Sequence, residues 1–390
     1  MEFSLTEEQR EIFDTTAKLA RTHLGRRPGR DGSVPDEAAW FRRRWQLCGR
    51  QGVLSNLLPE HHGGADVDAL TSAIMMQGLG YGGDDFGFVF SVAAHIYACT
   101  VPILRFGSAS LKDRYLSAMG SGKLIATHSI TEPEAGSDPF AMTTRARRDG
   151  DEYIIDGAKC YSSNAPFADL FVIHAKTDER AGFMGISAFV VERRTPGLSV
   201  SPPHKKTGLD GAPLGDVFLD GCRVPLANRI GEEGNGGVIF THSMNWERTC
   251  LFAAYLGAME RQLESVVAYA RERRQGRRRI GDYQAVAHRI ADMKVRLEAA
   301  RWLIYRGAWT LGQPSSELVS MDAAIAKLFI SEAAVASALD AIQVHGGAGI
   351  MAESDIGRYL QDAVPAKIFS GTVEIQRNTI ARTLGLGSGH

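Results

Sequence analysis

The amino-acid sequence predicts an α+β protein in which a β-rich middle region lies between two helical regions. Apolar residues recur at helical intervals near both ends of the chain, whereas short β-rich runs separated by turn residues fill the middle. Helices and strands segregated in this way argue against a parallel βαβ sheet. The chain has 390 residues, which is long for a single core. We therefore expect three domains, formed by residues 1–121, 122–234 and 235–390.

The first region has the pattern of a helical domain. Thr6 and Gln9 have the spacing of a capping box, in which two side chains satisfy backbone N–H groups at a helix start. Apolar residues then follow at helical intervals. A second helical pattern covers residues 68–119, and the glycines within residues 78–83 are expected to interrupt it.

The middle region has the pattern of a β domain. Asp156-Gly157 separates two β-rich runs, and Asp-Gly between such runs is a strong signal for a hairpin. Further strand candidates lie between Pro and Gly residues, at positions 170–175, 186–192 and 216–219. These short runs predict a sheet rather than more helices.

From about residue 236 the helical period returns and continues to the end of the chain. One amphipathic stripe consists of Ile325, Leu328, Val335, Leu339 and Ile342. Gly346-Gly347 follows this stripe, and glycine is the residue that most often ends a helix. The sequence therefore predicts a helical C-terminal domain with one long helix that stops at these glycines.

Charge and composition exclude several classes of partner. The formal net charge is −1, so no overall field attracts nucleic acid or an anionic membrane. Arginine runs at residues 26–27, 42–44 and 277–279 are interpreted as solvated faces, with attraction for phosphates or an acidic partner protein as the alternative.

The cysteines and the apolar runs bear on location. Five cysteines form no C-x-x-C pair, which argues against a disulfide framework and a zinc cluster, so no metal is expected. No run approaches the roughly 18 apolar residues of a spanning helix, and the N-terminus lacks the pattern of a signal peptide. We therefore expect a cytoplasmic protein without membrane insertion.

Three separated segments resemble the signature motifs of one enzyme family. Residues 131–138 are Thr-Glu-Pro-Glu-Ala-Gly-Ser-Asp, residues 343–349 are Gln-Val-His-Gly-Gly-Ala-Gly, and residues 371–377 are Gly-Thr-Val-Glu-Ile-Gln-Arg. Together with Leu58-Pro59-Glu60 and Gly63-Gly64, they resemble the motifs of the acyl-CoA dehydrogenase superfamily in its order and spacing. The resemblance covers nearly the whole chain. It implies an N-terminal helical domain, a middle β-barrel or sandwich domain and a C-terminal four-helix bundle.

The resemblance implies FAD as the cofactor. The segment from His128 to Ser137 resembles the loop that lies along the isoalloxazine, where Thr131 would hydrogen-bond the pyrimidine edge. Tyr161 resembles the aromatic residue that covers a ring face, and Ser163 resembles the hydroxyl that hydrogen-bonds flavin N5. Fixed donors suit a flavin because its reduction places negative charge near N1 and the carbonyl groups.

A second set of positions resembles the residues that reach the FAD of a neighbouring subunit. Arg273 and Gln284 match the contacts to the pyrophosphate, to which the arginine fork is suited. The other positions that match contacts to FAD, in the loop that completes this site and near the adenosine half, are Gln343, Gly346, Gly347, Thr372 and Glu374. The chain departs from the family pattern after Arg273, where Gln275-Gly276-Arg277 stands in place of Gln-Phe-Gly. An FAD that bridges subunits implies a homo-oligomer, either a dimer or a tetramer.

The base that removes the substrate α-proton is expected at one of two places. Many family members have a glutamate immediately before the Gly-Thr motif, but this chain has Ser370 there. The subgroup similar to isovaleryl- and long-chain acyl-CoA dehydrogenases carries the glutamate before an arginine on the first helix of the C-terminal domain. Glu247-Arg248 matches that pair, with a surface salt bridge as the alternative. Because a thioester α-proton is weakly acidic and needs a carboxylate base, the resemblance implies that Glu247 is catalytic.

The resemblance also implies substrate contacts. Arg248 would bind phosphate or pantetheine of the carrier, and Ser137 would contact the pantetheine arm. The backbone N–H of Ser370 would polarise the thioester carbonyl, a role that needs no particular side chain.

The sequence therefore predicts an FAD-dependent oxidoreductase that acts on the CH–CH bond of an acyl thioester. Glu247 would take the α-proton and flavin N5 the β-hydride. The thioester would be an acyl-CoA or an acyl-carrier-protein thioester, and an electron-accepting flavoprotein would reoxidise the cofactor. Two alternatives stay open: a flavin-dependent monooxygenase or oxidase on the same fold, and a non-catalytic thioester-binding protein.

Overall fold

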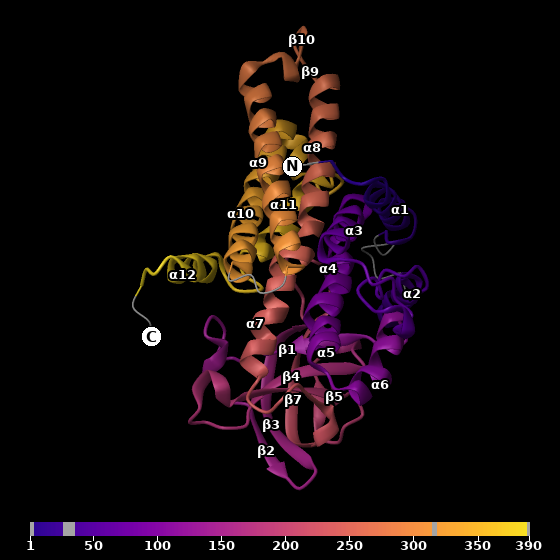
Figure 1. Ribbon diagram of the computed structural model, residues 1–390. Coiled ribbons are helices and arrows are strands. Elements are labelled where there is room, and N and C mark those ends of the chain that lie inside the picture. The colour runs from indigo at the N-terminus through magenta and orange to yellow at the C-terminus, as the bar shows by residue number, and fades with distance from the viewer. Residues whose placement is uncertain (1–3, 26–35, 314–317, 388–390) are drawn as a thin grey trace.

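The computed structural model describes residues 4–25, 36–313 and 318–387 (Figure 1). A sheet forms one end of the molecule, a bundle of long helices forms the other, and α7 passes from the sheet into the bundle. The N-terminal helices lie along one side. This helix–sheet–helix order confirms the α+β fold class that the sequence predicts.

The helices before the sheet are α1 (Glu7–His23), α2 (Glu37–Arg50), α3 (Ala69–Gly82), α4 (Phe86–Ala94), α5 (Val101–Phe106) and α6 (Ala109–Gly120). The capping box of α1 is confirmed, because Gln9 N donates to Thr6 Oγ1 at 3.2 Å and Thr6 N donates to Gln9 Oε1 at 3.1 Å. Leu79 of α3 and Leu256 of the C-terminal region belong to one buried cluster. The N-terminal helices therefore share a core with the bundle.

The predicted interruption is confirmed at Gly82-Gly83, where α3 ends, but it is wrong at Gly78 and Gly80. The helix continues through Gly78 and Gly80 and ends at Gly82. A Cβ on Gly78 would overlap the Thr16 side chain of α1, and a Cβ on Gly80 would overlap the carbonyl group of Ala254. Close helix packing therefore requires glycine here and outweighs its low helix propensity.

Replacing Gly80 with alanine is expected to destabilise the protein by about 1–3 kcal/mol, because overpacking forces the two helix backbones apart. Helix propensity alone predicts the opposite, namely that alanine stabilises the protein by roughly 1 kcal/mol. Gly25→Ala is the control, since no atom of the described residues lies within 4 Å of a Cβ at that position. Urea unfolding measures both variants, and a Gly80→Ala protein as stable as wild type would contradict the packing argument.

One helical segment is longer and more apolar than the sequence analysis expects. Residues Phe86–Phe106 form a helix of 21 residues that includes the π-helical segment η2 (His95–Thr100). Its length and mean hydropathy of 1.7 would suffice to cross a membrane, so the expectation of no such run is wrong. However, 94% of its apolar window is buried inside the protein, as in a core helix.

The middle region forms an eight-stranded sheet with the order β6-β7-β3-β2-β4-β5-β8 and with β1 beside β4. The strands are β1 (Ala126–Ser129), β2 (Arg145–Asp149), β3 (Glu152–Ser163), β4 (Leu170–Lys176), β5 (Ile186–Glu192), β6 (Leu198–Val200), β7 (Leu214–Pro225) and β8 (Arg229–Ile230). The three further strand candidates are confirmed within β4, β5 and β7.

The hairpin predicted at Asp156-Gly157 is wrong. Strand β3 runs through both residues, and the turn that precedes it lies at Gly150-Asp151, between β2 and β3. Gly157 has a φ of 149° and marks a register shift in the pairing of β3 with β7. The long partner strand β7 therefore makes the Asp-Gly pair an irregularity within a strand rather than a turn.

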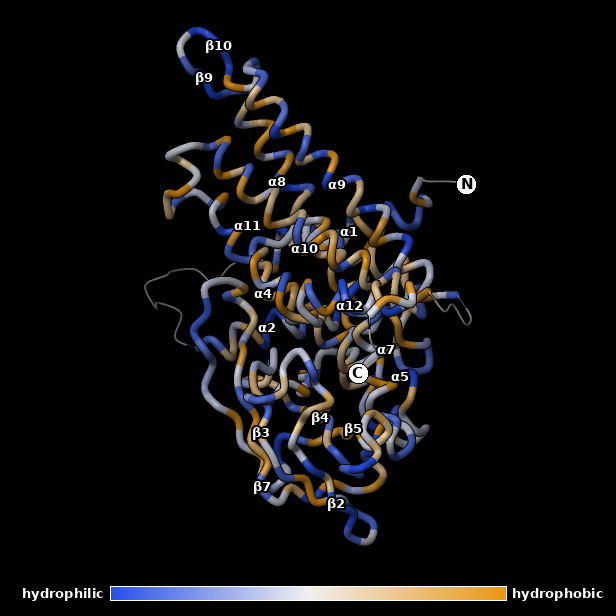
Figure 2. The backbone as a smooth tube through the Cα atoms, turned by 90° about the vertical axis from the view of Figure 1, so that its left-hand side faces the viewer, coloured by the Kyte–Doolittle hydropathy of each residue, from blue (hydrophilic) through white to orange (hydrophobic). Residues whose placement is uncertain are grey.

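The C-terminal region contains α7 (Gly236–Trp246), the π-helical segment η7 (Glu247–Leu251), α8 (Ala253–Glu272), α9 (Gln284–Leu311), α10 (Val319–His345), α11 (Ile356–Ala363) and α12 (Val373–Thr383). A small hairpin of β9 (Arg274–Gln275) and β10 (Arg278–Arg279) joins α8 to α9. Figure 2 shows that its tip is hydrophilic. The predicted end of α10 is confirmed, because Gly346 follows the last helical residue with a φ of 57°.

Candidate active site

Glu247 lies at the start of η7, at the junction of α7 and α8, and is 8% exposed. The second π-helical segment, η2, packs against η7. π-Helical turns are rare and are frequent at functional sites, because they displace side chains from regular helical positions. The alternative that Glu247 forms a surface salt bridge is therefore wrong, since this carboxyl group is buried.

Ser370, the residue at the other candidate position for the base, lies directly beside Glu247. Its Oγ donates a hydrogen bond to Glu247 Oε2 at 2.6 Å. Ser370 has a φ of 54° and Gly371 a φ of 85°, so the loop between α11 and α12 turns sharply at this point. The fold thus brings together the two positions that the sequence analysis weighed against each other.

The carbonyl groups of this loop accept hydrogen bonds from side chains of η7, α10 and α12. Arg248 Nε donates to Ser370 O at 3.0 Å, and Lys327 Nζ donates to Gly371 O at 2.6 Å. Gln376 Nε2 donates to Gly371 O at 2.8 Å. These contacts fix the left-handed turn and satisfy the partly buried carbonyl groups of Ser370 and Gly371. Arg248 therefore acts on the loop through the backbone of Ser370.

Burial sets the electrostatics of the site. It raises the pKa of Glu247 to about 7, although the Ser370 hydrogen bond and the charge of Arg248 act against the rise. Burial also lowers the pKa of Arg248 to about 10. For Lys327, burial and the nearby charge of Arg248 lower the pKa to about 7. A carboxyl group with a pKa near neutrality can both accept and release a proton at physiological pH.

Aromatic rings pack around the base and its loop. Trp246 stacks on Tyr97 of η2 at a centroid distance of 6.2 Å. Phe369, next to Ser370, lies 4.8 Å from Phe90 and 5.2 Å from Phe252. Rings packed this closely exclude water, which strengthens charge interactions at Glu247.

The positions expected to contact the flavin gather around one end of β3. Cys160 N donates to Thr131 O at 2.9 Å, which ties the 131–138 loop to β3. Tyr161 is 68% exposed and has a φ of 54°, and Ser163 ends the strand. His128 is different, because its ring contacts His174 (Nε2–Nε2 3.0 Å) inside the sheet. Burial lowers the pKa of His128 to about 4, so this ring is neutral.

A buried ion pair that the sequence analysis does not identify supports the 131–138 loop. Lys159 Nζ contacts Glu132 Oε1 at 2.8 Å, and both side chains are almost fully buried. Lys159 also donates to Ile130 O at 3.3 Å, and Glu132 accepts from the backbone N–H groups of Thr143 and Thr144. The ion pair therefore fixes the two residues on either side of Thr131, which are Ile130 and Glu132. A lysine in an otherwise alternating strand is the weak sequence signal for it.

The second set of expected FAD contacts lies elsewhere in the chain. Arg273 follows α8 and Gln284 begins α9, both near the β9–β10 hairpin at the end of the bundle opposite the sheet (Figure 1). A ring stack of Tyr269 on His345, with centroids 4.1 Å apart, brings the end of α10 to this place. Gln343, Gly346 and Gly347 belong to that end of α10. Thr372 caps α12, whose first turn contains Glu374.

The arginine runs have different environments. Arg42 pairs with Asp169 at 3.2 Å, and Arg44 pairs with Asp85 at 2.7 Å in a buried position. The run at residues 277–279 is exposed at the tip of the β9–β10 hairpin. The run at residues 26–27 lies outside the described residues. Arg42 and Arg44 are therefore structural, which corrects their interpretation as a solvated face.

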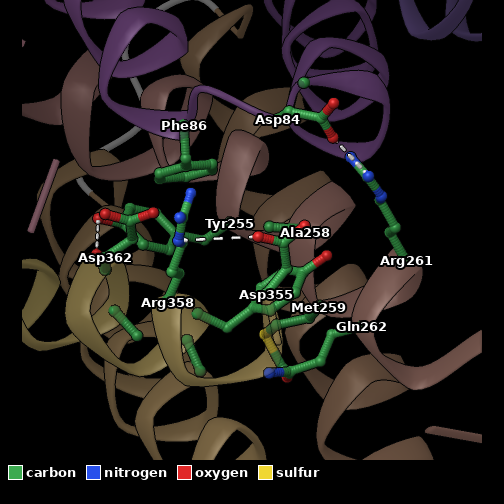
Figure 3. Close-up of a pocket in the computed structure, with 14 residues that line it drawn as sticks. Asp84, Phe86, Tyr255, Ala258, Met259, Arg261, Gln262, Asp355, Arg358 and Asp362 are labelled. Carbon is green, nitrogen blue, oxygen red and sulfur yellow. Dashed lines mark hydrogen bonds and ion pairs between the residues drawn. The ribbon is translucent and has the colours of Figure 1, made fainter. Parts of the chain in front are cut away.

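A small pocket of about 40 Å³ lies between the start of α4, α8 and α11 (Figure 3). Phe86 and Tyr255 line it, and their rings are 4.5 Å apart. The Tyr255 ring also lies 6.4 Å from the ring of Phe369, the residue before Ser370. None of the residues assigned to catalysis or to FAD lines this pocket.

Family models match nearly the whole chain. The acyl-CoA dehydrogenase N-terminal domain matches residues 6–123, the middle domain residues 127–222 and the C-terminal domain residues 234–385.

Curated and solved relatives are similar along their whole length. The L-prolyl-[peptidyl-carrier protein] dehydrogenase of Pseudomonas fluorescens is 47% identical over 88% of this chain and 90% of the relative. The structure "PigA with FAD and proline" has a TM-score of 0.93 at 40% identity, covering 99% of this chain and 100% of the other. The prolyl acyl carrier protein oxidase AnaB has a TM-score of 0.93 at 42% identity, covering 98% and 100%.

Proposed function

Since the chain belongs to the acyl-CoA dehydrogenase family, we propose that it is an FAD-dependent dehydrogenase of a carrier-bound thioester, with Glu247 as the base. The observation that carries this proposal is the buried Glu247 carboxyl group beside Ser370, with a pKa raised to about 7. A base whose pKa lies near the working pH is the most effective one for a weakly acidic α-proton. The backbone N–H of Ser370 is the proposed donor to the thioester carbonyl, with Arg248 and Ser137 as the contacts to the carrier arm.

The residues around Tyr161 fit an FAD isoalloxazine. Tyr161 combines a 68% exposed ring with a left-handed backbone, which is uncommon for an aromatic residue. A flat ring system packed on Tyr161, with Thr131 and Ser163 as donors, would account for both features. FAD supplies the acceptor for the hydride that leaves the substrate Cβ. The protein supplies the base, the donors and a water-poor setting.

The proposed substrate is an aminoacyl group, prolyl above all, on the phosphopantetheine arm of a carrier protein. The relatives at 47% and 40% identity are named with prolyl or proline. Trp246 and Phe369 are the chain neighbours of Glu247 and Ser370, and each packs against a further ring, which favours a compact acyl group over a long chain. An acyl-CoA is the second candidate, because the family takes its name from that substrate class.

Anaerobic mixing of the purified holoenzyme with a panel of thioesters tests this assignment. We expect L-prolyl carrier protein to bleach the flavin band, and isovaleryl-CoA and longer acyl-CoA esters to bleach it more slowly by at least about tenfold, equivalent to about 1.4 kcal/mol. Equal or faster bleaching by an acyl-CoA would reassign the substrate. A protein that no thioester bleaches would be a thioester-binding protein rather than a dehydrogenase.

The proposed electron acceptor is a second flavoprotein in the cytoplasm, a compartment that suits five free cysteines. One solved relative is named an oxidase, which favours molecular oxygen as the second candidate. Oxygen consumption during steady turnover, measured with and without an added electron-transferring flavoprotein, distinguishes the two. Turnover that needs only oxygen would reject the flavoprotein acceptor.

The chain is proposed to form a homo-oligomer in which FAD contacts two subunits. Arg273 and Gln284 lie at the end of the bundle away from the sheet, so in one chain they do not reach the flavin loop near Thr131. An apolar stripe on α9 offers a surface for association: Val295, Trp302 and Trp309 recur every seven residues and are 66%, 40% and 58% exposed.

Trp309→Glu is expected to weaken subunit association by roughly 30-fold or more, since a buried tryptophan at an interface typically contributes about 2 kcal/mol. The variant should also retain less FAD after gel filtration. Light scattering over a concentration series measures the first effect and the flavin absorbance ratio the second. Phe218→Glu, at an exposed position on β7, is the control. An unchanged mass for Trp309→Glu would exclude this stripe from the interface.

A further inference from the structure

Ser370 has a role that its family position does not explain, because its side chain is hydrogen-bonded to Glu247. Within the described residues, this is the only hydrogen bond to the Glu247 carboxyl group, and it engages Oε2. We infer that Ser370 is a positioning residue for Glu247: its hydroxyl holds Oε2 in place and leaves Oε1 as the oxygen that takes the α-proton. This inference rests on the proposed function of Glu247 as the base.

The loop geometry makes Ser370 suitable for this task. The left-handed backbone at Ser370 aims its short side chain at the base, and a longer side chain would meet the carboxyl group. Arg248 and Gln376 both donate to Ser370 O, at 3.0 Å and 3.2 Å, and so fix the backbone of this residue. A hydroxyl fixed in this way loses little conformational freedom when it donates.

The direction of the electrostatic effect follows from the contact. A hydroxyl that donates to a carboxylate stabilises the charged form and lowers the pKa of that group. Here it opposes the burial of Glu247, which raises the pKa. Loss of the hydroxyl should therefore raise the pKa further and reduce the fraction of active base below neutrality.

Other charged and titratable groups lie near Glu247 on the elements packed against η7. Arg248 is its neighbour on η7, and α4 (Phe86–Ala94) carries no charged side chain. Further groups on these elements are Cys250 on η7, Tyr97 and Cys99 on η2, His242 on α7, Tyr255 on α8, Arg306 on α9, Asp322 and Lys327 on α10, and Arg382 near the end of α12. Cys99 is buried with its pKa raised and His242 has its pKa lowered to about 4, so both are neutral near pH 7. Arg306 and Asp322 pair with each other at 2.7 Å.

The proton and electron balance of the reaction is unchanged by this role. The α-C–H bond breaks and an O–H bond forms at Glu247 Oε1. The β-C–H electron pair leaves with its hydrogen to FAD, which is the oxidant of the proposed function, and a Cα–Cβ double bond remains. Ser370 keeps its own proton throughout. It acts only on the orientation and the pKa of Glu247.

The test compares Ser370→Ala and Ser370→Gly with wild type in the pH dependence of anaerobic flavin reduction by the thioester. We expect the acidic limb of both variants to move to higher pH by about one pH unit, as for loss of a hydrogen bond to a charged group. One pH unit below the wild-type midpoint the rate should fall by roughly tenfold, while the high-pH plateau changes far less. An infrared titration of the oxidised enzyme, with Glu247→Gln as the reference, should show the carboxyl band moving in the same direction.

The Ser370→Gly variant distinguishes the loss of the hydroxyl from a change in backbone strain, because glycine accepts a φ of 54° more easily than serine or alanine. The inference predicts the same shift in both variants. A shift in Ser370→Ala alone would assign the effect to backbone strain and overturn it, as would no shift in either. Ser331→Ala removes another buried hydroxyl, bonded within α10 to Leu328 O, and should leave the profile unchanged.

The Glu247→Gln variant tests the proposed base independently of the Ser370 variants. If Glu247→Gln reduces the flavin as fast as wild type, the proposed function of Glu247 fails and the role of Ser370 fails with it. If Glu247→Gln is inactive and the Ser370 variants keep the wild-type profile, the base stands and only the positioning role is rejected.

Discussion

Glu247→Gln is expected to lower the rate of flavin reduction by the substrate thioester by about 10²–10⁴-fold, because a neutral amide cannot take the α-proton. The substitution keeps the size of the side chain, and Gln Oε1 can still accept from Ser370 Oγ, so FAD binding should not change. Stopped-flow absorbance under anaerobic conditions measures the rate, and the flavin-to-protein absorbance ratio measures the cofactor.

Glu264→Gln is the matched control, since Glu264 is also on the C-terminal helices but hydrogen-bonds Tyr81 at an exposed position. It should reduce the flavin at the wild-type rate. Bleaching of the Glu247→Gln enzyme at that same rate would remove Glu247 from the mechanism. A loss of FAD in this variant would mean that the carboxyl group is structural rather than catalytic.

Glu247→Gln also changes the way in which the free energy of unfolding depends on pH. The pKa of Glu247 is raised in the folded protein from 4.5 to about 7, so the folded state binds this proton more tightly than the unfolded chain. The favourable contribution is complete below pH 4.5 and is lost as the pH rises through about 7. Relative to Glu247→Gln, wild type should therefore become less stable over that range. Unfolding free energies at several pH values check the sign.

Lys159→Met is expected to have the largest effect on stability, a loss of about 3–5 kcal/mol, because it leaves the Glu132 carboxylate buried without its partner. Lys159 Nζ and Glu132 Oε1 are 2.8 Å apart, with side-chain exposures of 0% and 3%. The variant should also bind FAD more weakly, since Lys159 holds Ile130 O next to Thr131. Urea unfolding and FAD titration of the apoprotein measure the two effects.

The cost of Lys159→Met should shrink at low pH. Burial by itself would raise the pKa of Glu132, but the Lys159 ammonium and the donors from Thr143 and Thr144 outweigh it and lower the pKa to about 2. Without Lys159 the carboxyl group can protonate at a higher pH and become neutral. Lys294→Met, which breaks the exposed pair with Glu298, should cost less than about 1 kcal/mol. Equal costs for the two lysines would contradict the role of burial.

Local patterns in the sequence determine much of this protein. The capping box at Thr6, the β-rich runs of β4 and β5, and the glycine that ends α10 each depend on residues close in the chain. The motifs at residues 131–138, 343–349 and 371–377 are also contiguous, which is why they indicate the family. Glu247 could be proposed as the base because Ser370 occupies the other family position.

Long-range packing decided the rest. Gly80 lies inside a helix because Ala254 packs against it, and Asp156-Gly157 lies inside a strand because β7 runs alongside. Nothing in the sequence distinguishes Arg42 and Arg44 from other arginines, but in the folded protein they form ion pairs with Asp169 and Asp85.

The active site shows the same division most clearly. The sequence alone supplies the residue types, Glu247 and Ser370 among them. Only the tertiary structure placed the Ser370 hydroxyl 2.6 Å from the carboxyl group, although 123 positions separate the two in the chain. The physical reason is that secondary structure depends on neighbours along the chain, whereas a buried hydrogen bond depends on how distant elements pack.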